Sequence, residues 1–126
     1  MDYPADLKYT KDHEWVKVVG EVAVVGITDY AQDALGDIVF VEMPKAGVQA
    51  QKGKGIAVVE SVKSVSDVFA PVSGEVVEVN SELEAAPEKV NKDPYGSWMF
   101  KIKMKDQTEL SAMMSADDYK KLAGKD

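Results

Sequence analysis

Residues 60–67 read ESVKSVSD and lie between two apolar runs, IAVV at 56–59 and VFAPVSG at 68–74. Both runs are rich in β-branched side chains, which favours short β-strands. Lys63 stands midway between the runs, so the pattern predicts a β-hairpin with this lysine exposed at its tip. A lysine displayed on a rigid hairpin is a good attachment point for a lysine-modifying enzyme, although most exposed lysines carry no function.

The chain has 126 residues, of which 45% are hydrophobic and 29% are charged. This length and composition predict one globular domain, residues 1–126, with a core of its own. No apolar stretch approaches the roughly 20 residues of a membrane-spanning helix, so no membrane partner is expected. The first residues are acidic and resemble neither a signal peptide nor a transit peptide. We therefore expect a cytoplasmic protein, or one of the mitochondrial matrix whose leader has been removed.

The inventory of reactive side chains is small. The chain has no cysteine and one histidine, His13, which excludes disulfides, cysteine-zinc sites, thiol nucleophiles and histidine-rich metal clusters. Asp29, Asp33 and Asp37 lack the spacing of a calcium loop, so no metal site is predicted. The net charge of −7 disfavours nucleic acid and suits docking to basic patches on other proteins. A carrier or binding module therefore fits better than an enzyme, and His13 is expected to be a structural turn residue.

The remaining pattern predicts a mainly β protein with short helices. Thr28 or Asp29 is expected to begin a helix that Gly36 ends, and Ser81 is expected to cap a shorter one. Residues 48–54 are expected to form a polar connection. Apolar and alternating runs indicate strands at residues 7–10, 14–19, 21–27, 37–43, 56–59, 68–74, 75–79 and 97–104, and a last helix runs from residue 115 until Gly124 stops it.

A weak internal repeat groups these strands. Residues 36–41 resemble residues 74–79, and residues 55–60 resemble residues 96–101. Two similar units of this size predict two small antiparallel sheets, related by a pseudo-two-fold axis and packed as a flattened barrel. Lys63 falls at the turn that leads from the first unit into the second.

Several motifs, in order and over nearly the whole chain, resemble those of the glycine cleavage system H protein, a family of lipoyl carriers. The most specific is the stretch at 60–67 together with APVSGEV at 70–76. The other motifs lie at residues 9–16, 26–32, 35–39 and 90–99. Several motifs at consistent spacing are far more specific than one short pattern.

The resemblance implies a fold and a site. The fold would be the barrel-sandwich hybrid of lipoyl and biotinyl domains, with two small antiparallel sheets, short helices and a C-terminal helix. Lys63 matches the lysine to which lipoate is joined as an amide, by a lipoate ligase or by lipoyl-transfer enzymes. Glu14 and Asp67 match acidic positions near the cleft that receives the loaded arm. Some members carry a histidine at the position of Ala34, and alanine cannot form a hydrogen bond in its place.

The resemblance also implies a function and partners. A pyridoxal-phosphate glycine decarboxylase would load an aminomethyl group, and a folate-dependent aminomethyltransferase would accept it and release ammonia. A dihydrolipoamide dehydrogenase would then reoxidise the arm. The chain would be a monomeric carrier and not an enzyme. A long lysine stem suits this task, because a tethered group reaches successive active sites at high effective concentration.

Other functions remain open on the sequence alone. Lipoyl domains of 2-oxoacid dehydrogenases commonly show Asp-Lys-Ala at the tip and biotinyl domains show Met-Lys-Met, whereas residues 62–64 here read VKS. A donor that relays lipoyl groups to other carriers, and an unmodified interaction module, are both consistent with the same residues. The intact mass of the protein from its native host would separate a lipoylated carrier from an unmodified module.

Overall fold

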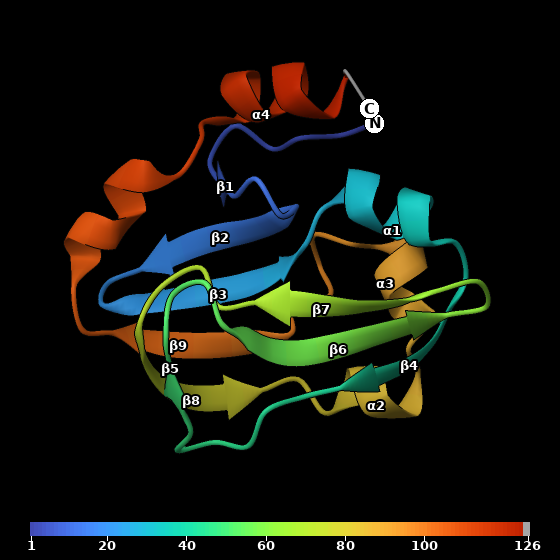
Figure 1. Ribbon diagram of the computed structural model, residues 1–126, viewed down its shortest axis with the longest axis horizontal. Coiled ribbons are helices and arrows are strands. Elements are labelled where there is room, and N and C mark those ends of the chain that lie inside the picture. The colour runs from blue at the N-terminus through green and yellow to red at the C-terminus, as the bar shows by residue number, and fades with distance from the viewer. Residues whose placement is uncertain (125–126) are drawn as a thin grey trace.

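The computed structural model describes residues 1–124, which form two antiparallel sheets surrounded by short helices (Figure 1). The strands are β1 (Lys8–Tyr9), β2 (Glu14–Val19), β3 (Val22–Ile27), β4 (Ile38–Glu42), β5 (Gln49–Ala50), β6 (Gly55–Ser61), β7 (Val65–Phe69), β8 (Gly74–Val79) and β9 (Phe100–Met104). The helices are α1 (Asp29–Leu35), α2 (Glu82–Ala85), α3 (Lys89–Lys92), the 3-10 helix η1 (Gln107–Ala112) and α4 (Ala116–Ala123). One sheet has the strand order β1-β2-β3-β9-β8-β5, and the other has the order β4-β6-β7.

The two sheets pack face to face around the main core. Side chains alternate between the faces of a strand, and on β3 this puts Ala23 and Val25 in the main core while Val24 is buried on the other face. The three-stranded sheet contributes Val41 from β4 and Val59 from β6 to the same core. The predicted sandwich of two antiparallel sheets, with short helices and a C-terminal helix, is therefore confirmed.

A second, smaller core anchors α4 to the outer side of the larger sheet, next to β1 (Figure 1). Tyr119 of α4 is fully buried and stacks on Tyr9 of β1, with 4.7 Å between the ring centroids. The Tyr119 hydroxyl lies 2.7 Å from Thr28 Oγ1 and 2.7 Å from His13 Nδ1. His13 has a positive φ of 70° in the turn between β1 and β2. It therefore serves as the structural turn residue that the sequence suggests.

The helix ends largely follow the sequence signals. Thr28 Oγ1 accepts a hydrogen bond from a backbone N–H in the first turn of α1, and Gly36 closes that helix with a φ of 81°. Ser115 caps α4 in the same way as Thr28 caps α1. The expected cap at Ser81 is wrong in its chemistry, because α2 begins after this residue but its hydroxyl makes no capping hydrogen bond.

Several connections differ from the prediction. Residues 48–54 contain the short strand β5, in which Gln49 pairs with Glu75 of β8. The strand expected at 97–104 begins only at Phe100. No pattern predicts α3 or η1, because a helix of one or two turns is too short to show a helical period. Within residues 1–124, no helix is long and apolar enough to cross a membrane, and no group of histidine and acidic side chains is placed to hold a metal ion.

The internal repeat corresponds to two equivalent strand pairs. β4 pairs with β6 in the smaller sheet, and β8 pairs with β9 in the larger one. Each pair has a register shift at the same position of the repeat, between Ile38 and Phe40 and between Val76 and Glu78. A bulge reverses which side chains face the core. The repeat therefore carries a local irregularity as well as an apolar pattern.

Candidate functional site

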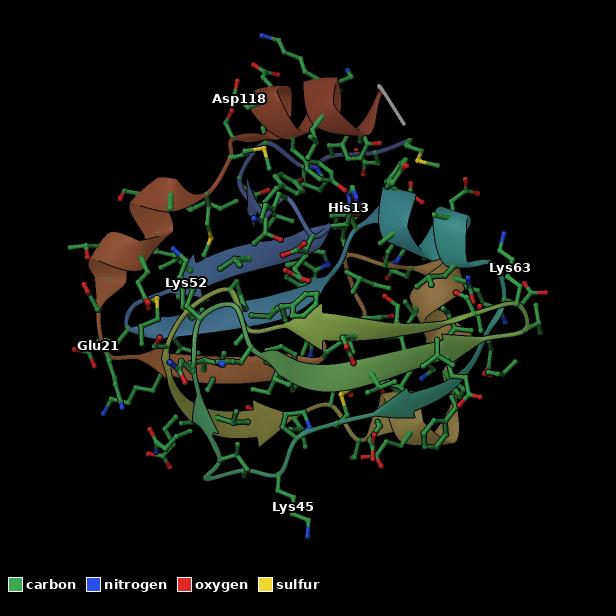
Figure 2. All side chains as sticks on the ribbon, viewed as in Figure 1. His13, Glu21, Lys45, Lys52, Lys63 and Asp118 are labelled. Atoms are coloured by element: carbon green, nitrogen blue, oxygen red, sulfur yellow. The ribbon has the colours of Figure 1, made fainter. Side chains whose placement is uncertain are left out.

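Lys63 lies in the loop that joins β6 to β7, exposed at one end of the molecule (Figure 2). The two strands are paired from Glu60 with Val65, next to the loop, back to Gly55 with Phe69. The predicted hairpin with an exposed lysine at its tip is confirmed, but its second strand covers Val65–Phe69 and not the expected residues 68–74. This pairing holds the backbone of the tip while the Lys63 side chain lies at the surface.

The side chain of Ser61 fixes the conformation of the tip. Ser61 is buried, and its Oγ accepts hydrogen bonds from the backbone N–H of Lys63 at 3.3 Å and of Ser64 at 3.0 Å. The Ser61 hydroxyl also donates to the carbonyl of Ser64 at 3.2 Å. A serine used in this way satisfies the polar groups of a turn from within the chain. The backbone at Lys63 is therefore held by both strand pairing and a side-chain cap.

Exposed apolar side chains flank this lysine in the chain and lie on β4, the strand that pairs with β6. The register shift in β4 leaves two consecutive residues, Val39 and Phe40, about half exposed. Val62 and Val65, on either side of the lysine along the chain, are 69% and 65% exposed. Apolar residues gathered at one place on a surface are typical of a region that another protein covers.

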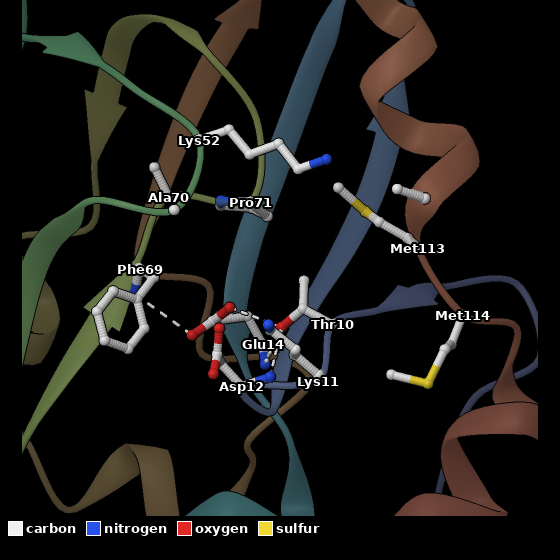
Figure 3. A pocket seen from close by; sticks show the side chains of 12 residues that line it. Thr10, Lys11, Asp12, Glu14, Lys52, Phe69, Ala70, Pro71, Met113 and Met114 are labelled. Carbon is white, nitrogen blue, oxygen red and sulfur yellow. Dashed lines mark hydrogen bonds between the residues drawn. The ribbon is translucent and has the colours of Figure 1, made fainter.

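A cleft of about 510 Å³ lies at the end of β7 that is farther from Lys63 (Figure 3). One part of the cleft lining comes from Thr10, just before β2, and from Glu14, the first residue of β2. Residues 69–71 form another part, and Met113 and Met114 line it from the segment before α4. Figure 3 shows the Glu14 carboxylate between Phe69 and Thr10. The cleft thus combines apolar walls with one buried carboxylate, and the exposed side chains of Lys11, Asp12 and Lys52 also line it.

Glu14 has only 2% of its surface exposed. Thr10 Oγ1 donates to Glu14 Oε1 at 2.6 Å, and the backbone N–H of Phe69 donates to Oε2 at 3.3 Å. Burial raises the pKa of Glu14 to about 7, because the loss of solvation outweighs the two hydrogen bonds that favour the charged form. A carboxyl group that titrates near neutral pH inside a cleft is a candidate for function.

Asp67 and Ala34 do not line this cleft. Asp67 is exposed on β7, two residues before Phe69, so both side chains lie on the same face of the strand. It therefore lies along β7 between the lysine tip and the cleft. Ala34 is exposed on α1. Of the acidic residues suggested by the resemblance, the structure brings only Glu14 into the cleft lining.

Sequence reasoning missed several residues of the site. Ser61 had a signal, since a serine two residues before a turn often caps it. No sequence pattern indicated Met113 and Met114, because their position at the cleft depends on a contact between segments that are far apart in the chain. Glu109 of η1 accepts hydrogen bonds from the backbone N–H of Ser73 at 2.8 Å and from its hydroxyl at 3.1 Å. This contact attaches η1 to the turn after β7 and so brings the two methionines to the cleft.

Comparison with known proteins agrees with this architecture over almost the whole chain. The model of the family described as "Glycine cleavage H-protein" matches residues 7–126. The chain belongs to the glycine cleavage H-protein family. The resemblance found in the sequence motifs is thereby confirmed.

Two glycine cleavage system H proteins of the family, one from Thermus thermophilus and one from Koribacter versatilis, are each 54% identical to this chain. The first match covers 97% of this chain and 96% of the relative, and the second covers 100% and 98%. The crystal structure of a glycine cleavage system H protein from Mycobacterium marinum has a TM-score of 0.89 at 37% identity, covering 96% of this chain and 98% of the other. The family fold is therefore shared over the full length.

Proposed function

We propose that this protein is a lipoylated carrier of the glycine cleavage system, with lipoate attached to Lys63 as an amide. The observation that carries the proposal is the exposed Lys63 at the tip of the β6–β7 hairpin, held by Ser61, in a chain of the H-protein family. An enzyme that acylates a lysine needs an accessible amine on a backbone that keeps its place. Family membership supports a carrier and not an enzyme.

The residues of the site fit a lipoyl group. Lys63 offers a long, flexible stem, and its charge is removed when the amide forms. When attached, lipoate supplies the reversible sulfur chemistry that carries an aminomethyl unit. At the far end of β7, the side chains of Phe69 and Met113 give the cleft apolar walls, which exclude water from whatever lies between them.

Within this proposal, Glu14 binds a cationic amine brought into the cleft. An ammonium close to the carboxyl group lowers the pKa of Glu14 from about 7, so the carboxylate and the cation stabilise each other at neutral pH. Thr10 and the backbone N–H of Phe69 orient the carboxylate before the amine arrives. Asp67 is exposed, so its part is that of a weakly attracting surface charge on the way to the cleft.

The proposal includes the partner enzymes that such a carrier visits. They are a pyridoxal-phosphate glycine decarboxylase, a folate-dependent aminomethyltransferase and a dihydrolipoamide dehydrogenase, with a lipoate ligase or lipoyl-transfer enzymes for the attachment. Support comes from the family, from the exposed apolar residues around Lys63 and from the net charge of −7, which suits docking to basic surfaces.

The test is to incubate the apo protein with lipoate, ATP and a lipoate ligase, and to map the label by peptide mass spectrometry. We expect one label, on Lys63, and no label in Lys63→Arg, because arginine keeps the positive charge but cannot form the amide. Lys45→Arg is the matched control, since it replaces an exposed lysine in a turn away from the hairpin tip (Figure 2). A label on another lysine, or a labelled Lys63→Arg protein, would contradict the proposal.

A further inference from the structure

Asn91 of α3 holds a segment that lies against the lysine tip. Its Oδ1 accepts a hydrogen bond from the backbone N–H of Ile38 at 2.8 Å. Its Nδ2 donates to the carbonyl of Gly36 at 2.9 Å and to Gln32 Oε1 at 2.9 Å. One side-chain amide therefore makes three hydrogen bonds, and these fix the end of α1 relative to the beginning of β4.

The segment held by Asn91, residues 36–38, contacts the tip in two ways. The carbonyl of Asp37 accepts a hydrogen bond from the backbone N–H of Val62 at 3.0 Å. Gly36 lies beneath the lysine side chain, so that a Cβ added there would be 3.4 Å from Cε and 3.9 Å from Nζ of Lys63. Asn91 is bonded to the residues on both sides of Asp37, and so it determines where the Asp37 carbonyl meets the tip.

The arrangement requires a donor at Asn91. Gln32 Nε2 donates to Asp29 Oδ1 at 2.8 Å, which turns the Gln32 oxygen toward Asn91. The carbonyl of Gly36 is an acceptor as well. Asn91→Asp has nearly the same shape and keeps the acceptor for Ile38, but it sets a carboxylate oxygen against these two acceptors. The substitution should therefore disturb the segment without creating a cavity.

We propose that Asn91 is a positioning residue for the acylation of Lys63. It acts through residues 36–38, and its three hydrogen bonds are to Gln32, Gly36 and Ile38 and not to the lysine. The inference rests on the proposed function, because the reaction that it serves is the attachment of lipoate. The physical reason is pre-organisation: an enzyme that meets a tip already in its reactive conformation avoids the entropic cost of ordering it.

The first readout is hydrogen exchange of backbone amides in the apo protein, which does not depend on lipoate. We expect the Val62 amide to exchange about tenfold faster in Asn91→Asp and Asn91→Ala, while the Val59 amide in the middle of β6 keeps its rate. Asn80→Ala is the matched control, because Asn80 Nδ2 donates to the carbonyl of Trp98 at 2.9 Å and its loss leaves residues 36–38 intact. Asn91→Ala is the second variant in case Asn91→Asp does not fold.

The second readout is the steady-state kinetics of lipoylation by a lipoate ligase. We expect the KM for the apo protein to rise about tenfold in the Asn91 variants with kcat within about twofold, because only the fraction of tips in the competent conformation falls. Asn80→Ala should keep both constants within about twofold of wild type.

The outcomes separate the two proposals. If the wild-type protein is not labelled on Lys63, the proposed function fails. If the Val62 amide exchanges at the wild-type rate in the Asn91 variants, Asn91 does not hold residues 36–38 against the tip, and the positioning role is overturned. If the wild type is labelled but the variants keep its KM, the positioning role of Asn91 is overturned and the proposed function stands.

Discussion

The hydroxyl of Thr10 donates a 2.6 Å hydrogen bond to the carboxylate of Glu14, and the backbone N–H of Glu14 donates back to Thr10 Oγ1 at 3.2 Å. These two hydrogen bonds join Thr10 and Glu14, and so this partner of the buried carboxylate is a neutral hydroxyl and not a cation. Neutral hydrogen bonds offset only part of the solvation that burial removes. Glu14 should therefore make the stability of the folded protein depend on pH.

We expect Glu14 to lower the free energy of unfolding as the pH rises from about 4.5 to about 7. Burial raises the pKa of Glu14 from the ordinary value of 4.5 to about 7. In this window the folded state keeps a proton that the unfolded state has released, so stability falls with rising pH. The full difference is about 3 kcal/mol at about 1.4 kcal/mol for each pKa unit.

Denaturant titrations at about pH 5 and about pH 8 measure this dependence. Glu14→Gln should remove that part of it, because glutamine does not titrate. Glu42→Gln, which replaces an exposed carboxyl on β4, should leave the dependence as it is in wild type. An unchanged pH dependence in Glu14→Gln would show that Glu14 is not the group responsible.

Moving the lysine by one place should slow its acylation. The double change Lys63→Ser with Ser64→Lys preserves composition, but it attaches the amine to the next residue of the turn, whose side chain leaves the backbone in another direction. We expect the rate of lipoylation by a ligase to fall at least ~10-fold, which corresponds to ~1.4 kcal/mol. Equal rates would mean that the ligase recognises exposure and not the shape of the tip.

Glu14 should protect the carried aminomethyl unit better than Asp67 does. The decay of loaded protein is followed as formaldehyde release with no transferase present. The Glu14 carboxylate is shielded from water, so Glu14→Gln should weaken the binding of the carried unit in the cleft by about 1–3 kcal/mol and speed its decay accordingly. Asp67→Asn is the matched control, and its effect should be far smaller, because exposed charge pairs contribute little.

Both variants should be lipoylated on Lys63 at the wild-type rate, which separates protection in the cleft from attachment at the tip. If both decay like wild type, neither carboxylate protects the unit and the apolar walls remain as the source of protection.

Tyr119→Phe should loosen the C-terminal helix without affecting the tip. The change removes the hydrogen bonds of the buried hydroxyl with Thr28 and His13. We expect a loss of about 1–3 kcal/mol in the free energy of unfolding, measured in urea, with lipoylation of Lys63 unchanged. Tyr3→Phe is the control, since the Tyr3 hydroxyl has only a 3.6 Å contact with the sulfur of Met1 and should cost much less. Equal losses in both variants would contradict the role given to the Tyr119 hydroxyl.

The sequence by itself determined the features that depend on near neighbours. Two β-branched runs around Lys63 make a hairpin with the lysine at its tip, because strand pairing across a short turn needs only adjacent segments. Thr28 and Ser115 begin helices because their hydroxyls satisfy backbone N–H groups within the next three residues. The repeat, the two sheets and the family could be predicted for the same reason, because short patterns along the chain indicate each of them.

Only the tertiary structure decided which residues form the cleft and what supports the tip. Glu14 and Asp67 match the family equally well, yet Glu14 is buried in the cleft lining and Asp67 is exposed on β7. Met113 reaches the cleft through a contact of η1 with the turn after β7. Asn91 holds Ile38 across 53 residues of chain. Burial, pKa and long-range hydrogen bonds depend on which distant segments the folded chain brings together, and local patterns of sequence do not specify this.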